Sequence, residues 1–188
     1  MLVERAKSGD LAAFEELVTT YQDLAIRTAY VIVADHDEAG DAAQDAFVKA
    51  FRALDRFRAG APFRPWLLRI VANEAIDRRR AGQRRADLRV RLSMGDPTLR
   101  PEAAPEETVL AEERRHEVLD AVNALRPEDR LVIAYRYWLE LPEAEMATAL
   151  GVARGTVKSR LSRAIGRLRA QIAESAGRPS SGEGSGDA

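Results

Sequence analysis

The chain has 188 residues, and its hydrophobic content of 46% is enough for one ordinary domain or two small packed ones. It has no cysteine, which excludes disulfides and thiolate zinc sites. A formal net charge of −1 means that any nucleic-acid binding must rest on local basic patches. The longest apolar run, residues 24–34, is too short to span a bilayer, and no secretory signal is recognisable at the N-terminus. We therefore expect no membrane insertion and a cytoplasmic location.

Helical periodicity runs along most of the chain, and no stretch alternates as a strand, which predicts an all-α fold. A first amphipathic helix begins after Asp10, a suitable N-cap. A second begins near Asp37 and is expected to bury five residues. These are Ala43, Phe47, Ala50, Phe51 and Leu54. Residues 56–61 are expected to form a loop, and residues 62–80 a third helix with Pro65 in its first turn.

The composition changes at Gly82 to charges, glycine and proline, which is typical of a linker. We therefore expect two small helical domains, residues 1–81 and 108–175, joined by a flexible linker over residues 82–107. The second domain should contain helices near residues 112–125 and 127–139. The tail, residues 176–188, has nothing to bury and is expected to be disordered.

Residues 141–169 have the pattern of a helix-turn-helix, in which Pro142 begins a short helix and Gly151 ends it. The second helix has an apolar stripe. Its members are Val157, Leu161, Ala164, Ile165 and Leu168. The opposite side presents Ser159, Ser162, Arg163 and Gly166, with Lys158, Arg160 and Arg167 beside them. Such a helix fits a DNA major groove, although a solvated basic helix would have the same pattern.

One side of the third helix combines an indole, two cations and an amide. Its residues are Trp66, Arg69, Ile70, Asn73, Asp77 and Arg80. This mixture suits single-stranded nucleic acid, because a ring can stack on a base while arginine holds the backbone. Alternatively, Trp66 packs in the core and residues 78–80 are a solvated helix end.

The second helix carries polar residues opposite its apolar face, namely Asp41, Asp45 and Arg52, with Gln44 nearby. Acidic side chains near a helix start can simply stabilise its dipole, which explains Asp37 and Asp41. Asp45 lies too far along the helix for that explanation.

Two segments of the first domain resemble region 2 of bacterial sigma factors. They are EAGDAAQDAFVKAF (residues 38–51) and FRAGAPFRPWLLRIVANEAIDRRR (residues 57–80). The helix-turn-helix resembles region 4. The order of the two regions and the short linker are similar to the extracytoplasmic-function (ECF) group of the sigma-70 family. The resemblance covers residues 4–173 and implies core RNA polymerase, through its β′ and β subunits, promoter DNA and an anti-sigma factor as partners.

The resemblance also implies three sets of binding residues. Core polymerase would be bound by Asp41, Gln44, Asp45, Lys49 and Arg52. The −10 element would be melted and read by Phe57, Phe63, Trp66, Arg69, Asn73, Asp77 and Arg80. The −35 element would be read by Thr156, Lys158, Ser159, Arg160, Ser162, Arg163 and Arg167. The linker would pass through the polymerase channel. Pro142, Gly40 and Ser162 depart from common family residues, so the promoter preference stays open.

Other function classes are less consistent with the sequence. An enzyme is disfavoured because His36 and His116 are the only histidines and neither has a ligand at metal spacing, so no cofactor or metal is expected. A stand-alone helix-turn-helix regulator would bury the face from Trp66 to Arg80 and bind duplex DNA without polymerase. A sigma-like interaction module would bind polymerase without opening promoters.

Overall fold

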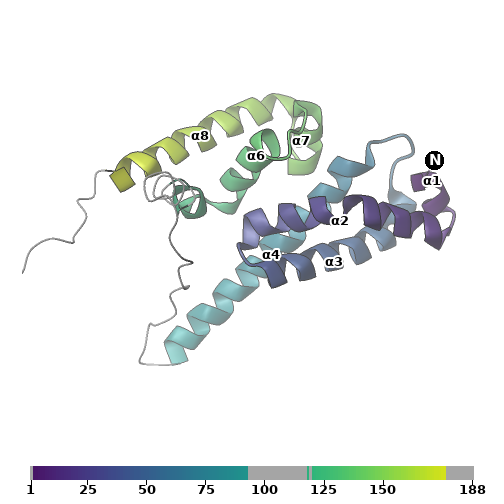
Figure 1. Ribbon diagram of the computed structural model, residues 1–188, viewed down its shortest axis with the longest axis horizontal. Coiled ribbons are helices and arrows are strands. Elements are labelled where there is room, and N and C mark those ends of the chain that lie inside the picture. The colour runs from purple at the N-terminus through teal and green to yellow at the C-terminus, as the bar shows by residue number, and fades with distance from the viewer. Residues whose placement is uncertain (1, 93–117, 119, 177–188) are drawn as a thin grey trace, which may run out of the picture.

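The computed structural model describes residues 2–92, 118 and 120–176, and its regular elements in these ranges are helices (Figure 1). The first bundle contains α1 (Leu2–Lys7), α2 (Leu11–Val33), α3 (His36–Ala53), the 3-10 turn η1 (Leu54–Arg56) and α4 (Phe63–Leu92). The second contains a helical stretch at residues 120–124, α6 (Pro127–Tyr137), α7 (Glu143–Leu150) and α8 (Arg154–Ala176). The all-α prediction is confirmed.

Side-chain caps fix where the first long helices start. The Asp10 carboxylate accepts a hydrogen bond from the Ala13 N–H at 3.0 Å, as predicted. That bond, together with the guanidinium of Arg5, holds the pKa of Asp10 below its usual value. Helix α3 starts slightly earlier than expected, because Asp35 accepts from the N–H of Glu38 at 2.9 Å.

The core of the first bundle lies between α2, α3 and α4, and small side chains let these helices pack closely. Five alanines there have no exposed surface: Ala25, Ala29, Ala42, Ala46 and Ala50. Phe51 differs from its prediction. It is 43% exposed, and its ring packs at 4.8 Å against Phe14 near the edge of the bundle.

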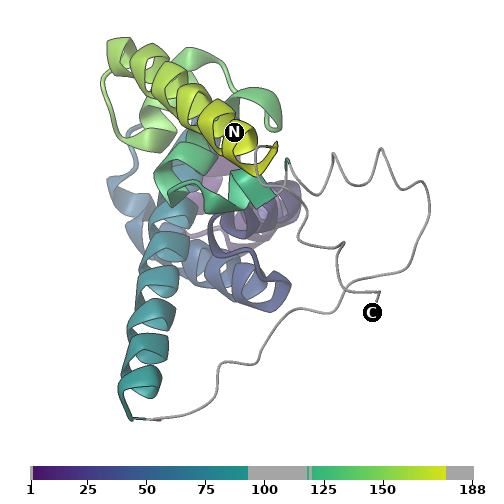
Figure 2. The ribbon, with the colours of Figure 1, turned by 90° about the vertical axis from the view of Figure 1, so that its left-hand side faces the viewer.

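Helix α4 is longer than predicted and extends beyond the rest of the first bundle (Figure 2). Residues 82–92, which composition assigned to the linker, continue the helix through Gly82. Such an extension has no apolar stripe to detect, and alanine, glutamine and arginine favour helix strongly enough to outweigh one glycine. The rest of the predicted linker, residues 108–117 and the predicted disordered tail from residue 177 lie outside the described residues.

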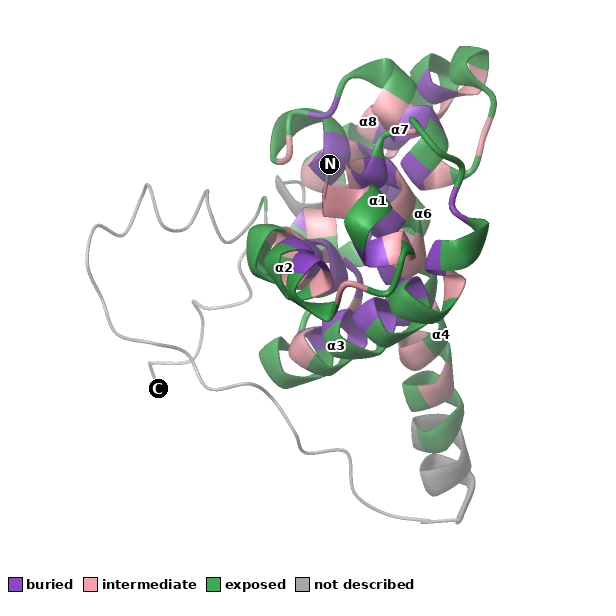
Figure 3. Cartoon of the chain, turned by 90° about the vertical axis from the view of Figure 1, so that its right-hand side faces the viewer, coloured by how far each residue is buried: buried purple, intermediate pink, exposed green. Residues whose placement is uncertain are grey.

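The two bundles pack against each other and share one hydrophobic core. Helix α6 contacts α2, and α7 contacts α4. Tyr135, Leu141 and Met146 of the second bundle are buried in the same cluster as Leu67 and Leu68 of the first. Figure 3 shows buried positions continuing from one bundle into the other. In the part of the chain that the structure describes, no helix is both long and apolar enough to cross a membrane.

Candidate functional site

The predicted helix-turn-helix is formed by α7, α8 and the turn between them. Gly151 ends α7 with a φ of 64°, a left-handed conformation that glycine adopts without steric cost. The Gly151 N–H donates a hydrogen bond to the Thr148 carbonyl at 3.2 Å. The Val152 N–H donates to the Ala147 carbonyl at 2.9 Å. These bonds satisfy carbonyls that the helix end would leave free and turn the chain into α8.

Helix α8 buries its apolar stripe and turns its polar side to solvent. Val157 and Ala164 are buried, whereas four residues expected to read the −35 element are exposed. These are Lys158, Ser159, Ser162 and Arg163. Thr156, Arg160 and Arg167 are half-buried. The helix therefore offers hydroxyls and arginine to a ligand along most of the predicted surface.

An acidic residue of α6 holds one of these arginines in place. Asp129 is buried, and its two carboxylate oxygens lie 3.2 Å from Nη1 of Arg167 and 3.2 Å from Nε of Arg126. The same residues line a hollow of about 380 Å³ together with Arg160 and Arg163. Glu128 completes the lining, so four guanidiniums outnumber two carboxylates, and the net positive charge suits a phosphate. The sequence did not indicate Arg126 and Asp129, because they lie at the start of α6, which precedes the motif.

The polar side of α4 is exposed where the sequence predicts single-strand binding. Arg69, Asn73, Asp77 and Arg80 are exposed, and Trp66 is half-buried. Arg80 also lies 4.0 Å from both Asp77 and Glu128. The residues predicted to share this side of the helix therefore do so.

Phe57 and Phe63 require a correction, because both are buried, at 5% and 6% exposure. Their ring centroids lie 4.8 and 5.4 Å from that of Trp66, and 5.8 Å from each other. Adjacent aromatic rings gain more from packing together than from contact with water. In this arrangement the two phenylalanines support Trp66 and the loop between them, and they do not face a ligand directly. The alternative in which Trp66 packs in the core is thus partly correct.

All five residues expected to bind polymerase lie on the exposed side of α3: Asp41, Gln44, Asp45, Lys49 and Arg52. Three of them pair with α4. Glu74 binds Lys49 and raises the pKa of its ammonium through that hydrogen bond. Arg78 lies 2.5 Å from Asp45 and 3.4 Å from Asp41, and these carboxylates raise the pKa of its guanidinium, with Asp45 the larger cause.

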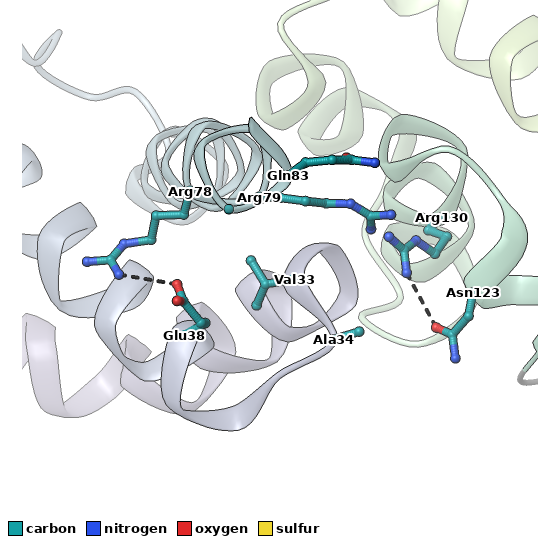
Figure 4. Close-up of a pocket in the computed structure, with 9 residues that line it drawn as sticks. Val33, Ala34, Glu38, Arg78, Arg79, Gln83, Asn123 and Arg130 are labelled. Carbon is teal, nitrogen blue, oxygen red and sulfur yellow. Dashed lines mark hydrogen bonds and ion pairs between the residues drawn. The ribbon is translucent and has the colours of Figure 1, made fainter. Parts of the chain in front are cut away.

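The arginine run at residues 78–80 is not a simple solvated helix end. Arg78 turns toward α3, whereas Arg79 leaves α4 on the other side and donates to the Ile32 carbonyl at 2.7 Å (Figure 4). Arg80 approaches Glu128 of the second bundle. Three consecutive residues thus point in three directions around the helix, a division that only the packing of neighbouring helices determines.

The structure also shows an apolar groove that the sequence did not indicate. It has a volume of about 410 Å³ and runs between α2 and α6, where it is lined by Tyr30, Ile133, Tyr137 and Trp138 among others. Tyr137 and Trp138 are 63% and 61% exposed. Large apolar side chains exposed side by side are typical of surfaces that bind other proteins.

The described ranges contain no group of three or more His, Asp or Glu side chains placed to hold a metal ion. The chemistry that these surfaces offer is hydrogen bonding, ion pairing and ring stacking. Such chemistry binds nucleic acid and protein partners.

Comparisons with known proteins agree with both motifs. Sigma-70 region 2 matches residues 17–85, and Sigma-70 region 4 matches residues 115–168. The RNA polymerase sigma-H factor of Pseudomonas aeruginosa is 36% identical over 87% of this chain and 88% of its own length. The ECF RNA polymerase sigma factor SigW of Bacillus subtilis is 31% identical over 90% of this chain and 94% of its own.

Solved structures agree as well. CnrH in complex with the cytosolic domain of CnrY has a TM-score of 0.66 and 26% identity, covering 92% of this chain and 96% of that one. The sigma factor RpoE in complex with the anti-sigma factor NepR, from Bartonella quintana, has a TM-score of 0.62 and 26% identity, covering 85% and 96%. The chain therefore belongs to the sigma-70 family of bacterial RNA polymerase sigma factors, in the ECF group.

Proposed function

We propose that this alternative sigma factor binds core RNA polymerase and directs it to promoters by reading the −10 element with α4 and the −35 element with α8. The observation that carries the proposal is the pair of exposed polar helix faces, one in each sigma region, with residues suited to single-stranded and duplex DNA respectively. As a transcription initiation factor, the chain is not an enzyme. It acts where polymerase and promoter DNA meet, in the cytoplasm.

At the −10 element, the loop at residues 57–63 and the α4 face would capture the melted strand. Extruding a base costs a few kcal/mol, which contacts to the free base can offset. The aromatic cluster under Trp66 supports this role, because it fixes the loop while leaving part of the indole accessible. Exposed Asn73 is the candidate for hydrogen bonding to a base edge, and Arg69 for holding a phosphate.

At the −35 element, α8 would enter the major groove with Ser159, Ser162 and Arg163 toward the bases. The arginine hollow supported by Asp129 would hold a phosphate of the DNA backbone. In the first bundle, the polar side of α3 would dock on the coiled coil of the polymerase β′ subunit. The segment between the two regions would pass through the polymerase channel.

Co-elution with core polymerase in size exclusion tests this proposal. The purified chain should elute with bacterial core RNA polymerase, and an excess of a known sigma factor should displace it. That known factor, run alone with core, is the positive control. If the control forms a complex and this chain does not, the stand-alone regulator becomes the better interpretation, and a gel shift on promoter duplex without polymerase should then show tight binding.

Asn73→Ala is expected to impair promoter opening more than formation of the closed complex, because the amide would contact a base only after melting. Permanganate footprinting measures the opened strand, and a gel shift measures the closed complex. Gln22→Ala, which removes an exposed amide from α2, is the matched control. Equal losses in both steps would exclude a melting role for Asn73.

An anti-sigma factor is the expected protein regulator, because the similar structure of RpoE is a complex with the anti-sigma factor NepR, and that of CnrH is a complex with the cytosolic domain of CnrY. The groove at Tyr137 and Trp138 supports this expectation, because it exposes apolar surface that both bundles contribute. Displacement of the chain from core polymerase by a candidate anti-sigma protein is the direct test.

A further inference from the structure

A hollow of about 450 Å³ lies where the end of α2 meets α3, α4 and α6, and arginine dominates its lining (Figure 4). Its charged residues are three arginines and one glutamate, namely Arg78, Arg79, Arg130 and Glu38. Gln83 and Asn123 add two side-chain amides. The lining therefore carries a net charge of +2, and none of these residues belongs to the surfaces proposed to bind DNA or polymerase.

The charge of one arginine, Arg78, is already balanced. Its guanidinium lies 2.5 Å from Asp45, 3.4 Å from Asp41 and 3.5 Å from Glu38, all three on α3. Figure 4 shows Arg78 and Glu38 together on one side of the hollow, away from Arg130. The positive charge that remains in the hollow therefore belongs to Arg79 and Arg130.

These two arginines share a single acceptor that carries only partial charge. Nη1 of Arg79 donates to the Ile32 carbonyl at 2.7 Å, and Nη2 of Arg130 donates to the same oxygen at 3.1 Å. Neither guanidinium forms an ion pair with the residues that the structure describes. The C-terminal end of a helix carries roughly half an elementary negative charge, so the end of α2 balances only part of two positive charges.

Burial makes this imbalance costly and leaves donors without acceptors. Arg130 is only 2% exposed, and its Nε is buried with no hydrogen-bond partner in the described part of the chain. Charges removed from water are normally paired with an opposite charge. Oδ1 of Asn123 accepts from Nη1 of Arg130 at 3.3 Å, which leaves the NH2 group of that amide as a further donor beside the guanidinium. The hollow thus presents positive charge and N–H donors to an anion from outside the chain.

We propose that this hollow binds a diphosphate group between Arg79 and Arg130, carried by inorganic pyrophosphate or by a nucleoside diphosphate. A diphosphate suits two guanidiniums, because each phosphoryl group accepts paired N–H bonds and its negative charge balances a cation. The volume lies within the usual range for small-molecule sites, roughly 300–1,000 Å³, so a nucleoside also has room. The proposal goes beyond promoter recognition, because it gives this sigma factor a site for a small phosphate-bearing effector.

Isothermal titration calorimetry of the full-length chain with pyrophosphate, at constant ionic strength, tests the site. Arg79→Gln keeps a donor for the Ile32 carbonyl but removes the charge, and Gln83→Glu adds a carboxylate to the lining with little change in shape. Each variant should bind pyrophosphate roughly tenfold more weakly than the wild-type chain, as for one lost charge-assisted hydrogen bond. Arg84→Gln, which removes an exposed arginine of α4 outside the hollow, is the matched control and should bind like the wild-type chain.

The arginine hollow at α8 also suits phosphate, so an Arg167→Gln variant is titrated in parallel. It should keep the binding that depends on Arg79. If only Arg167→Gln loses binding, if Arg79→Gln and Gln83→Glu bind as tightly as the wild-type chain, or if the wild-type chain does not bind pyrophosphate, the proposed site is excluded.

Urea denaturation gives an independent measurement, because a ligand that binds only the folded chain raises its free energy of unfolding. Pyrophosphate should raise the urea midpoint of the wild-type chain and of Arg84→Gln, but not that of Arg79→Gln or Gln83→Glu. Equal shifts in all four proteins would exclude the site. Circular dichroism without ligand checks that each variant is folded.

Titration with ADP distinguishes the two sources of the diphosphate. Tighter binding of ADP than of pyrophosphate identifies a nucleotide, whereas equal or weaker binding identifies pyrophosphate, and Arg79→Gln should weaken both. These measurements need neither polymerase nor promoter DNA. Their failure would therefore leave the proposed sigma function intact, which co-elution with core polymerase tests separately.

Discussion

Leu67→Ala is expected to lower the free energy of unfolding by about 2–5 kcal/mol, the range for truncating a buried leucine that leaves a cavity. Leu67 lies in the first turns of α4 with no exposed surface, where α2 and α3 pack against that helix. The same core cluster includes many fully buried alanines, which have no flexible side chains to move into a cavity. Urea denaturation followed by circular dichroism measures the change.

Leu11→Ala is the matched control, because Leu11 is 62% exposed on α2 and should change stability only slightly. The shared core also predicts how the chain unfolds. Since buried residues of both bundles form one cluster, the bundles should lose structure together in a single transition. A Leu67→Ala variant as stable as Leu11→Ala would contradict the packing of α4, and two separate transitions would contradict the shared core.

Local sequence patterns predicted several of the helices and the outward side of α8. The start of α2 followed from Asp10, the turn before α8 from Gly151, and the outward side of α8 from its 3.6-residue period. These features depend on neighbours within one or two turns, so a single sequence contains them. Helix α1 was not predicted, because its six residues are too few to show a helical period.

Several other errors share a cause, which is contact between residues distant in sequence. Burial of Phe57 depends on rings that α4 brings to it, and the direction of Arg79 depends on the end of α2. The shared core was missed because it requires Tyr135 to reach Leu68, 67 positions earlier in the chain. A period along one helix identifies which side is buried but not which partner covers it.

Arginine therefore has two roles here that composition cannot distinguish. Arg78, Arg79 and Arg130 are committed to contacts inside the protein, whereas Arg163 is exposed on the proposed DNA face. The forked guanidinium suits both roles, because it can bind a helix end or carboxylate as readily as a phosphate or a guanine. Only its surroundings decide which role each arginine has.

Arg163→Ala is accordingly expected to cost about 1–3 kcal/mol in recognition of the −35 element, as for one lost contact to a base. The Arg163 guanidinium lies along α8, where Nε donates to the Ser159 carbonyl at 3.1 Å, and it forms no ion pair with the residues that the structure describes. Binding to core polymerase should not change, because α3 carries that proposed surface. Transcription from a cognate promoter and from one with an altered −35 element measures the loss and its specificity.

Arg169→Ala, which removes an exposed arginine farther along the same helix, is the control for charge alone. If both variants lose activity equally on both promoters, Arg163 contributes only charge, and the α8 face does not read bases at that position.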